Sequence, residues 1–210
     1  LIFNIENKLY YKIDNNNLEF SVKYSSENID DRIIEWEIID SAGFSIDPPF
    51  INSISQQPYE SNQGPILPFS DIRSTNSTKI KRLQSYLEWS KISNNSSGEF
   101  YYNAGLRMHG WKINENKLKT VISPRAQFAI KPNWEKDMLF RLSTGIYYQP
   151  PFYRELRGFD GNVNYDVKAQ KSIHYVLGAD YLFYTWGRPF KWTTEIYYKD
   201  LKGLIPYKVD

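Results

Sequence analysis

Alternation of apolar with polar or small residues recurs along the chain and predicts β-strands. Between Ile173 and Phe183, apolar or small side chains occupy every second position, and mostly polar or small ones lie between them. Successive side chains of a strand point to opposite faces of a sheet, so each such strand has one apolar and one polar face. The pattern predicts about eight strands, at residues 1–12, 18–24, 82–89, 100–111, 123–130, 138–149, 173–183 and 190–199.

The predicted connections differ in length in a regular order. Four are short and rich in turn-forming residues, at 14–17, 94–98, 131–137 and 185–189. Longer ones alternate with them, at 41–78, 112–119, 150–170 and from near Gly203. This alternation is typical of an outer-membrane barrel, which has short turns on its periplasmic side and longer loops outside.

Charged residues follow the polar face of the predicted strands. Arg82, Arg107, Arg125, Arg141, Lys191 and Glu195 all fall on it, and the opposite face of each central segment carries no charge. An Arg or Lys facing lipid at the bilayer midplane costs about 2–4 kcal/mol, so the pattern predicts that these charges point into a lumen. Antiparallel sheets of soluble sandwiches show the same alternation, and that alternative stays open.

Composition changes this picture in two ways. The chain has 17 Tyr, 12 Phe and 6 Trp among its 210 residues, a content that suits aromatic girdles at two water–lipid boundaries. It has no cysteine, two histidines and a net charge of +2, which argue against a disulfide framework, a thiolate or His-rich metal centre and a nucleic-acid partner. No run approaches the roughly 18 apolar residues of a membrane-spanning helix.

Candidate chemistry is sparse, and the sequence predicts neither an enzyme nor a cofactor. No nucleophile lies in a pattern with a general base. The segment DGNVNYD (160–166) is similar to the start of a calcium loop, but Tyr165 stands where the turn glycine belongs and Lys171 where the bidentate glutamate belongs. We therefore predict a turn-rich loop there and no metal.

The segment PPFYRELR (150–157) is the strongest candidate for a binding site. Its prolines cannot donate to a strand ladder, so a strand ends there. Its aromatic rings, carboxylate and guanidinium groups could bind a ligand at a barrel mouth or hold the loop to its own wall, and the second role is favoured. The candidates in this segment are Tyr153, Arg154, Glu155 and Arg157. Residues 53–78 are predicted to form a long loop that folds over a pore or contacts a partner.

The candidates for side chains that line the lumen, and contact a plug or a ligand, come from the polar strand faces. They are Arg82, Glu88, Arg107, His109, Arg125, Arg141, His174 and Glu195.

Three motifs in order carry a family resemblance. YYQPPFYREL (147–156), KAQKSIHYVLGADY (168–181) and RPFKWTTEIYYKDLKGLIPY (188–207) resemble the C-terminal barrel half of TonB-dependent outer-membrane receptors. The likeness is to the branch with a carboxypeptidase-like regulatory domain before its plug. Residues 31–45 and 121–133 also resemble barrel segments of that family. Lys168, Gln170 and Lys171 match its KAQKS segment, and we expect them to organise the loop and the upper rim.

The resemblance implies a barrel of about 22 strands with a plugged lumen, to whose wall residues 1–210 contribute. The family's plug and energy-coupling box have no counterpart in this sequence, so we expect a fragment. The implied function is TonB-energised uptake of an unidentified nutrient across a Gram-negative outer membrane. The implied partners are outer-membrane lipid and the TonB complex acting through the absent plug region, with a surface lipoprotein as a further candidate. Two other functions stay open: a receptor-like barrel serving as a scaffold or export partner, and a soluble β-sandwich binding module.

Overall fold

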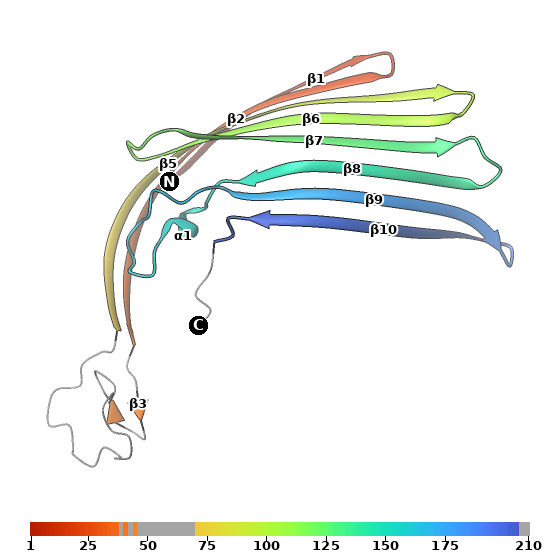
Figure 1. Ribbon diagram of the computed structural model, residues 1–210. Coiled ribbons are helices and arrows are strands. Elements are labelled where there is room, and N and C mark those ends of the chain that lie inside the picture. The colour runs from red at the N-terminus through yellow and green to blue at the C-terminus, as the bar shows by residue number, and fades with distance from the viewer. Residues whose placement is uncertain (38–39, 42–43, 46–69, 206–210) are drawn as a thin grey trace. The chain divides into compact units, whose positions relative to one another are not determined.

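The computed structural model describes residues 1–37, 40–41, 44–45 and 70–205 of an all-β chain (Figure 1). One antiparallel sheet of eight strands has the order β1-β2-β5-β6-β7-β8-β9-β10. Its strands are β1 Ile2–Ile13, β2 Asn16–Glu37, β5 Ser70–Asn95, β6 Gly98–Ile113, β7 Lys119–Pro132, β8 Asp137–Gln149, β9 Gln170–Thr185 and β10 Arg188–Lys202. A short helix, α1 Tyr153–Leu156, follows β8, and β3 Asp40–Ser41 pairs with β4 Phe44–Ser45.

The chain forms two compact units. The larger contains residues 1–28, 78–156 and 165–210, and the smaller contains residues 29–77 and 157–164. Within the described residues β1 and β10 are the two edges of the eight-stranded sheet, so the sheet is not closed on itself.

The prediction of an all-β chain with about eight strands is confirmed, and so is the alternation of connection lengths. Two residues join β1 to β2, β5 to β6 and β9 to β10, and four join β7 to β8. Asp14 and Trp186 adopt left-handed backbone conformations in two of these turns, with φ of 49° and 50°. The connections of β6 to β7 and of β8 to β9 are longer.

Two strand boundaries differ from the prediction. β2 continues to Glu37, and β5 begins at Ser70, within the predicted loop of residues 41–78. The start of β5 is rich in Ser, Thr and Asn and lacks apolar alternation, but backbone groups of any residue can pair with a neighbouring strand. Most of the predicted loop, residues 46–69, lies outside the described residues.

Register shows which residues share a face, because directly paired residues of an antiparallel sheet point to the same side. Pairing partners from β5 to β10 form one row made of Glu88, Gly105, Arg125, Gly145, His174 and Lys199. We call the side that carries this row the charged face and the other side the apolar face.

The most buried apolar side chains lie near the longer connections. Ile80 pairs with Ile113, and two positions along the sheet Arg82 pairs with Trp111. The Ile80 and Leu156 side chains are fully buried, and those of Trp111 and Ile113 are nearly so. The core of the larger unit is therefore small and lies where the segment after β8 returns to the sheet.

Candidate functional site

All eight predicted lumen residues lie on the charged face. The register relates them through strands β5 to β10, at alternate positions of each strand. They are Arg82, Glu88, Arg107, His109, Arg125, Arg141, His174 and Glu195. They do not form one cluster, because six strands carry them. The structure brings four of them together, in the two pairs Arg125–Glu88 and Arg141–Glu195.

The first pair is Arg125 with Glu88, which lie on β7 and β5 with Gly105 of β6 between them. Neighbouring strands are about 4.8 Å apart, so only side chains that lie flat on the sheet can meet across a third strand. The Arg125 guanidinium reaches the Glu88 carboxylate, which also accepts a hydrogen bond of 2.8 Å from Nδ2 of Asn103. A Cβ at Gly105 would lie 3.0 Å from Nε of Arg125. The glycine therefore leaves the space in which the arginine lies.

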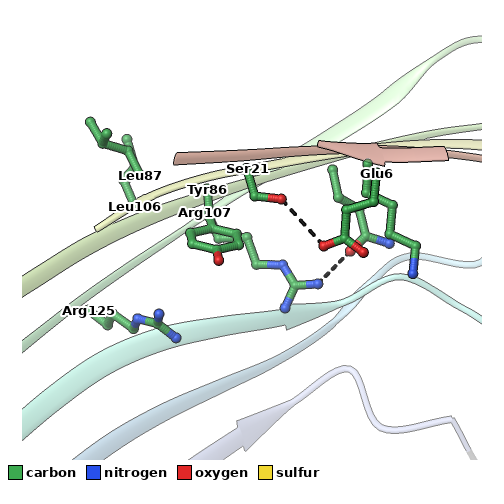
Figure 2. Close-up of a pocket in the computed structure, with 9 residues that line it drawn as sticks. Glu6, Ser21, Tyr86, Leu87, Leu106, Arg107 and Arg125 are labelled. Atoms are coloured by element: carbon green, nitrogen blue, oxygen red, sulfur yellow. Dashed lines mark hydrogen bonds between the residues drawn. The ribbon is translucent and has the colours of Figure 1, made fainter. Parts of the chain in front are cut away.

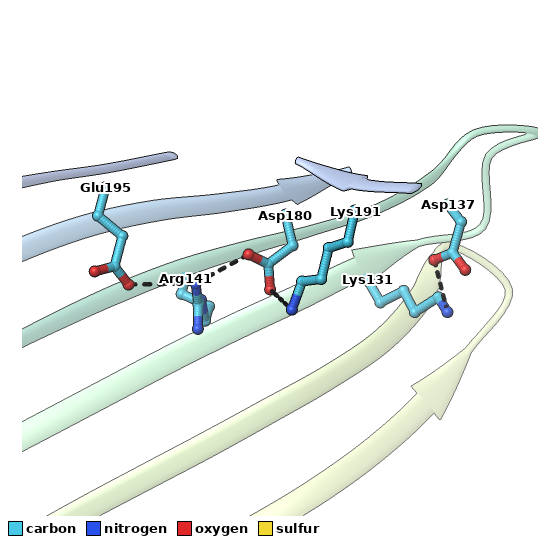
Figure 3. A network of polar contacts seen from close by, with 6 residues as sticks. All are labelled: Lys131, Asp137, Arg141, Asp180, Lys191 and Glu195. Carbon is cyan, nitrogen blue, oxygen red and sulfur yellow. Dashed lines mark hydrogen bonds and ion pairs between the residues drawn. The ribbon is translucent and has the colours of Figure 1, made fainter. Parts of the chain in front are cut away.

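The second pair repeats this arrangement on β8, β9 and β10 (Figure 3). Arg141, Gly178 and Glu195 are direct partners in one row, and Nη2 of Arg141 lies 3.3 Å from Oε1 of Glu195. A Cβ at Gly178 would meet Nε of Arg141 at 3.4 Å. Asp180, which is almost fully buried, accepts ion pairs of 3.1 Å from both Arg141 and Lys191. This network balances two cations with two carboxylates.

The two histidines are not brought together, because they lie on β6 and β9 with two strands between them. His109 packs edge-on against Trp111 with ring centroids 6.3 Å apart, and its Nε2 has no hydrogen-bond partner among the described residues. His174 exchanges a hydrogen bond with Ser172, and its ring centroid is 4.7 Å from that of Tyr147. Among the residues that the structure describes, neither histidine lies beside both a nucleophile and a carboxylate, as a catalytic triad would require.

The predicted rim segment is held to the sheet by Glu155. Its buried carboxylate accepts hydrogen bonds from the backbone N of Phe152, at 2.9 Å, and from Nε2 of Gln170, at 3.0 Å. Arg82, one of the predicted lumen residues, donates to the carbonyl of Pro151 at 2.9 Å and lies 3.9 Å from Glu27. Glu155 and Arg82 therefore fix the segment after β8 against β5 and β9.

The other rim candidates are spread over several elements. Tyr153 and Arg154 lie in α1. Nζ of Lys171, in β9, lies 5.7 Å from the ring centroid of Tyr148, and Lys168 is exposed in the connection before β9. Arg157 belongs to the smaller unit, where its guanidinium lies 3.5 Å from the Asp31 carboxylate.

Residues 160–166, whose sequence is similar to the start of a calcium loop, contain a turn that is closed by hydrogen bonds of its own side chains. Asp160 accepts hydrogen bonds of 3.0 Å from the backbone N and from Nδ2 of Asn162, and these bonds hold the pKa of its carboxyl below the usual value. The carbonyl of Gly161 accepts bonds of 2.8 Å from Ser74 and Asn76 of β5. The described part of the chain contains no group of three or more His, Cys, Asp or Glu side chains placed to hold a metal ion.

A cavity of about 260 Å³ is lined by residues of β1, β2, β5, β6 and β7 (Figure 2). Ser21 donates to Oε1 of Glu6 at 3.5 Å, and Arg107 donates to Oε1 of Gln84. Its lining residues are Glu6, Ser21, Lys23, Gln84, Tyr86, Leu87, Leu106, Arg107 and Arg125. Sequence reasoning selected only Arg107 and Arg125 of these, because the alignment of β1 and β2 with β5 requires the register.

The apolar face carries no charge over the central part of each strand and is exposed. Leu142, Leu177 and Ile196 are 50%, 55% and 69% exposed. In a soluble protein, leucine and isoleucine side chains of a sheet usually lie in the core. Other exposed members are Leu9, Leu18, Phe20, Leu83, Leu87, Leu106 and Ile122.

Aromatic side chains gather on this face near the short connections. Phe100 and Phe128 have ring centroids 6.3 Å apart, and Phe183 and Phe190 have theirs 5.7 Å apart. We call this group the aromatic row: Trp89, Phe100, Tyr102, Phe128, Phe140, Tyr181, Phe183, Phe190 and Trp192. Trp111 does not belong to this group, because it is buried on the charged face, where it pairs with Arg82.

No helix in the described residues is long and apolar enough to cross a membrane. Comparison with known proteins gives no matching family model, no matching curated protein and no matching solved structure.

Proposed function

We propose that this chain forms part of the wall of an outer-membrane β-barrel, a TonB-dependent receptor that imports a nutrient. The observation that carries the proposal is the separation of charge between the two faces of one sheet. Every lumen candidate lies on the charged face, and large apolar side chains stay exposed on the other. Leaving a Leu, Ile or Phe side chain in water forgoes about 1.5–3 kcal/mol, a loss that contact with lipid removes.

The dimensions of the apolar face support a membrane setting. On β8, β9 and β10, a member of the aromatic row lies eight residues from a tyrosine, and the three couples are Phe140 with Tyr148, Phe183 with Tyr175, and Phe190 with Tyr198. Eight residues of strand span about 27 Å, or about 21 Å along the membrane normal at a tilt near 40°. This is close to the roughly 25 Å apolar band of known outer-membrane barrels.

The soluble sandwich would need a second layer over the apolar face. Within the described residues the remaining strands are β3 and β4, of two residues each. A lipid environment accounts for the exposed side chains without such a layer, so we favour the barrel. The energy-coupled uptake itself rests on the resemblance of residues 147–156, 168–181 and 188–207 to TonB-dependent receptors.

Membrane fractionation of the native full-length protein tests the proposal. We expect it in the outer-membrane fraction, with a band that shifts on a gel when the sample is heated, because folded barrels resist detergent until they are boiled. A protein that is stable without detergent and never shifts would exclude the barrel and favour the sandwich. Outer-membrane location with no energy-dependent uptake would favour a scaffold.

A further inference from the structure

We propose that the cavity on the charged face binds the oxyanion group, carboxylate or phosphate, of a small ligand. The inference deepens the proposed uptake function, and it rests on that function only for its statement that the charged face lines a lumen. The cavity itself is a feature of strands β1, β2, β5, β6 and β7.

The charges around the cavity do not cancel. Arg125 is paired with Glu88. Glu6 lies directly opposite Lys23 in the register, but its carboxylate contacts Lys8 at 3.5 Å. Lys23 has no ion pair among the described residues, so Glu6 is the one carboxylate set against two lysines and one positive charge is left over.

Arg107 adds a second uncompensated cation. Its Nη2 donates to the neutral side-chain carbonyl of Gln84, and no carboxylate lies within 4 Å of it among the described residues. A guanidinium presents donors in a planar fork that matches a carboxylate or phosphate, and here the bond to Gln84 fixes part of that fork. The remaining donors of Arg107 are available to a ligand.

The nearby carboxylate of Glu19 reduces this excess of two positive charges to one but does not remove it. It accepts a hydrogen bond from the Tyr86 hydroxyl, and it does not line the cavity. Counting it still leaves Lys8, Lys23 and Arg107 against Glu6 and Glu19, one positive charge in excess. Tyr86 is thereby held as part of the cavity wall.

The size of the cavity limits what it binds. Its volume of about 260 Å³ is below the roughly 300–1,000 Å³ of pockets that enclose drug-sized ligands. The site therefore takes a single small ring or the charged arm of a larger molecule. Arg107 is exposed to water, where salt screens its charge, so we expect weak binding. Weak binding is compatible with a ligand that passes through the lumen.

The test uses the purified full-length protein and saturation-transfer NMR with glucuronate, at constant ionic strength. Glucose, which has the same ring without the carboxylate, is the matched ligand control. We expect a signal for glucuronate and none for glucose. The variants Arg107→Gln and Lys23→Gln should each weaken binding about tenfold, the factor for one lost charge-assisted hydrogen bond. Lys199→Gln removes a cation of the same face outside the cavity and should bind as the parent does.

Competition with inorganic phosphate identifies the chemistry of the site. If phosphate displaces glucuronate, the site recognises oxyanions in general, and if it does not, the site recognises a carboxylate. Equal glucuronate signals in the parent and in the double variant Arg107→Gln/Lys23→Gln would overturn the inference, as would a signal for glucose as strong as that for glucuronate.

The outcome is separate from that of the transport proposal. A heat-shifted outer-membrane protein without Arg107-dependent glucuronate binding would refute this site and leave the barrel intact. A soluble protein that binds glucuronate through Arg107 would do the reverse. The gel shift of each variant also shows whether it is folded.

Discussion

Gly105 and Gly178 have the same role, which is to let an arginine lie flat and reach a glutamate two strands away. We predict that Gly105→Ala uncouples Arg125 from Glu88, because the added Cβ would lie 3.0 Å from Nε and 3.3 Å from Cγ of Arg125. The pair is partly exposed, so its coupling free energy should be about 0.2–1 kcal/mol in the parent and near zero in the variant. A double-mutant cycle with Glu88→Gln and Arg125→Gln, measured by denaturant unfolding of the full-length protein, gives both values.

Gly110→Ala is the matched control for this prediction. Gly110 lies in the same strand, and a Cβ there would meet no atom closer than 3.7 Å. Its cycle should give the parental coupling. If the coupling also persists in Gly105→Ala, the glycine is not what permits the ion pair.

The roles of single residues could be predicted only in part. Alternation was enough to place Arg125 and Arg141 on the polar face. It could not show that a glycine lies beside each of them, since that depends on which residues of neighbouring strands are paired. Arg82 follows the same alternation, yet it binds the Pro151 carbonyl, because the segment after β8 folds back over its end of the sheet.

Individual strands carry the separation of charge that supports the membrane proposal, and β8 offers a direct test of it. Leu142 and Ser143 are neighbours that face opposite sides. We predict that Leu142→Arg destabilises the protein folded in lipid by about 2–4 kcal/mol, because it places a charge against the bilayer midplane. Ser143→Arg should cost much less, since the charged face already holds Arg141 and Arg125.

Unfolding titrations of both variants in lipid vesicles provide the measurement. The two substitutions introduce the same side chain one residue apart, so a difference reports the face and not the size of the arginine. Equal effects of Leu142→Arg and Ser143→Arg would show that the apolar face does not contact lipid.

At the level of elements, the sequence predicted what has a clear period and missed what does not. All eight strands with alternating side chains were found, and the short turns between them carry the expected Asn, Ser and Gly residues. The four-residue helix α1 was not predicted, because one turn of helix shows no periodicity. The first residues of β5 were placed in a loop because their Ser, Thr and Asn side chains favour turns in isolation.

For the molecule as a whole, the two edge strands matter most. In the described part of the chain, β1 and β10 each pair with one neighbouring strand, so alternate backbone N–H groups of each have no partner in the described sheet. Lipid cannot satisfy such groups, and each one left unbonded there costs several kcal/mol. If the sheet lies in a membrane, both edges must therefore pair with further strands.

This requirement predicts the hydrogen-exchange pattern of β10 in the intact protein. Amides that bond to β9 are protected in any case, since they belong to the sheet. In a closed barrel the alternate amides should be protected to the same degree, because a further strand accepts from them. A free edge would instead give fast and slow exchange at alternate residues between Arg188 and Lys202.

Site-resolved exchange of the full-length protein in micelles decides between a closed barrel and a free edge. β8, which has strands on both sides, supplies the reference for complete protection. Alternating exchange in β10 beside uniform protection in β8 would mean that the sheet ends at β10 and that no barrel closes there.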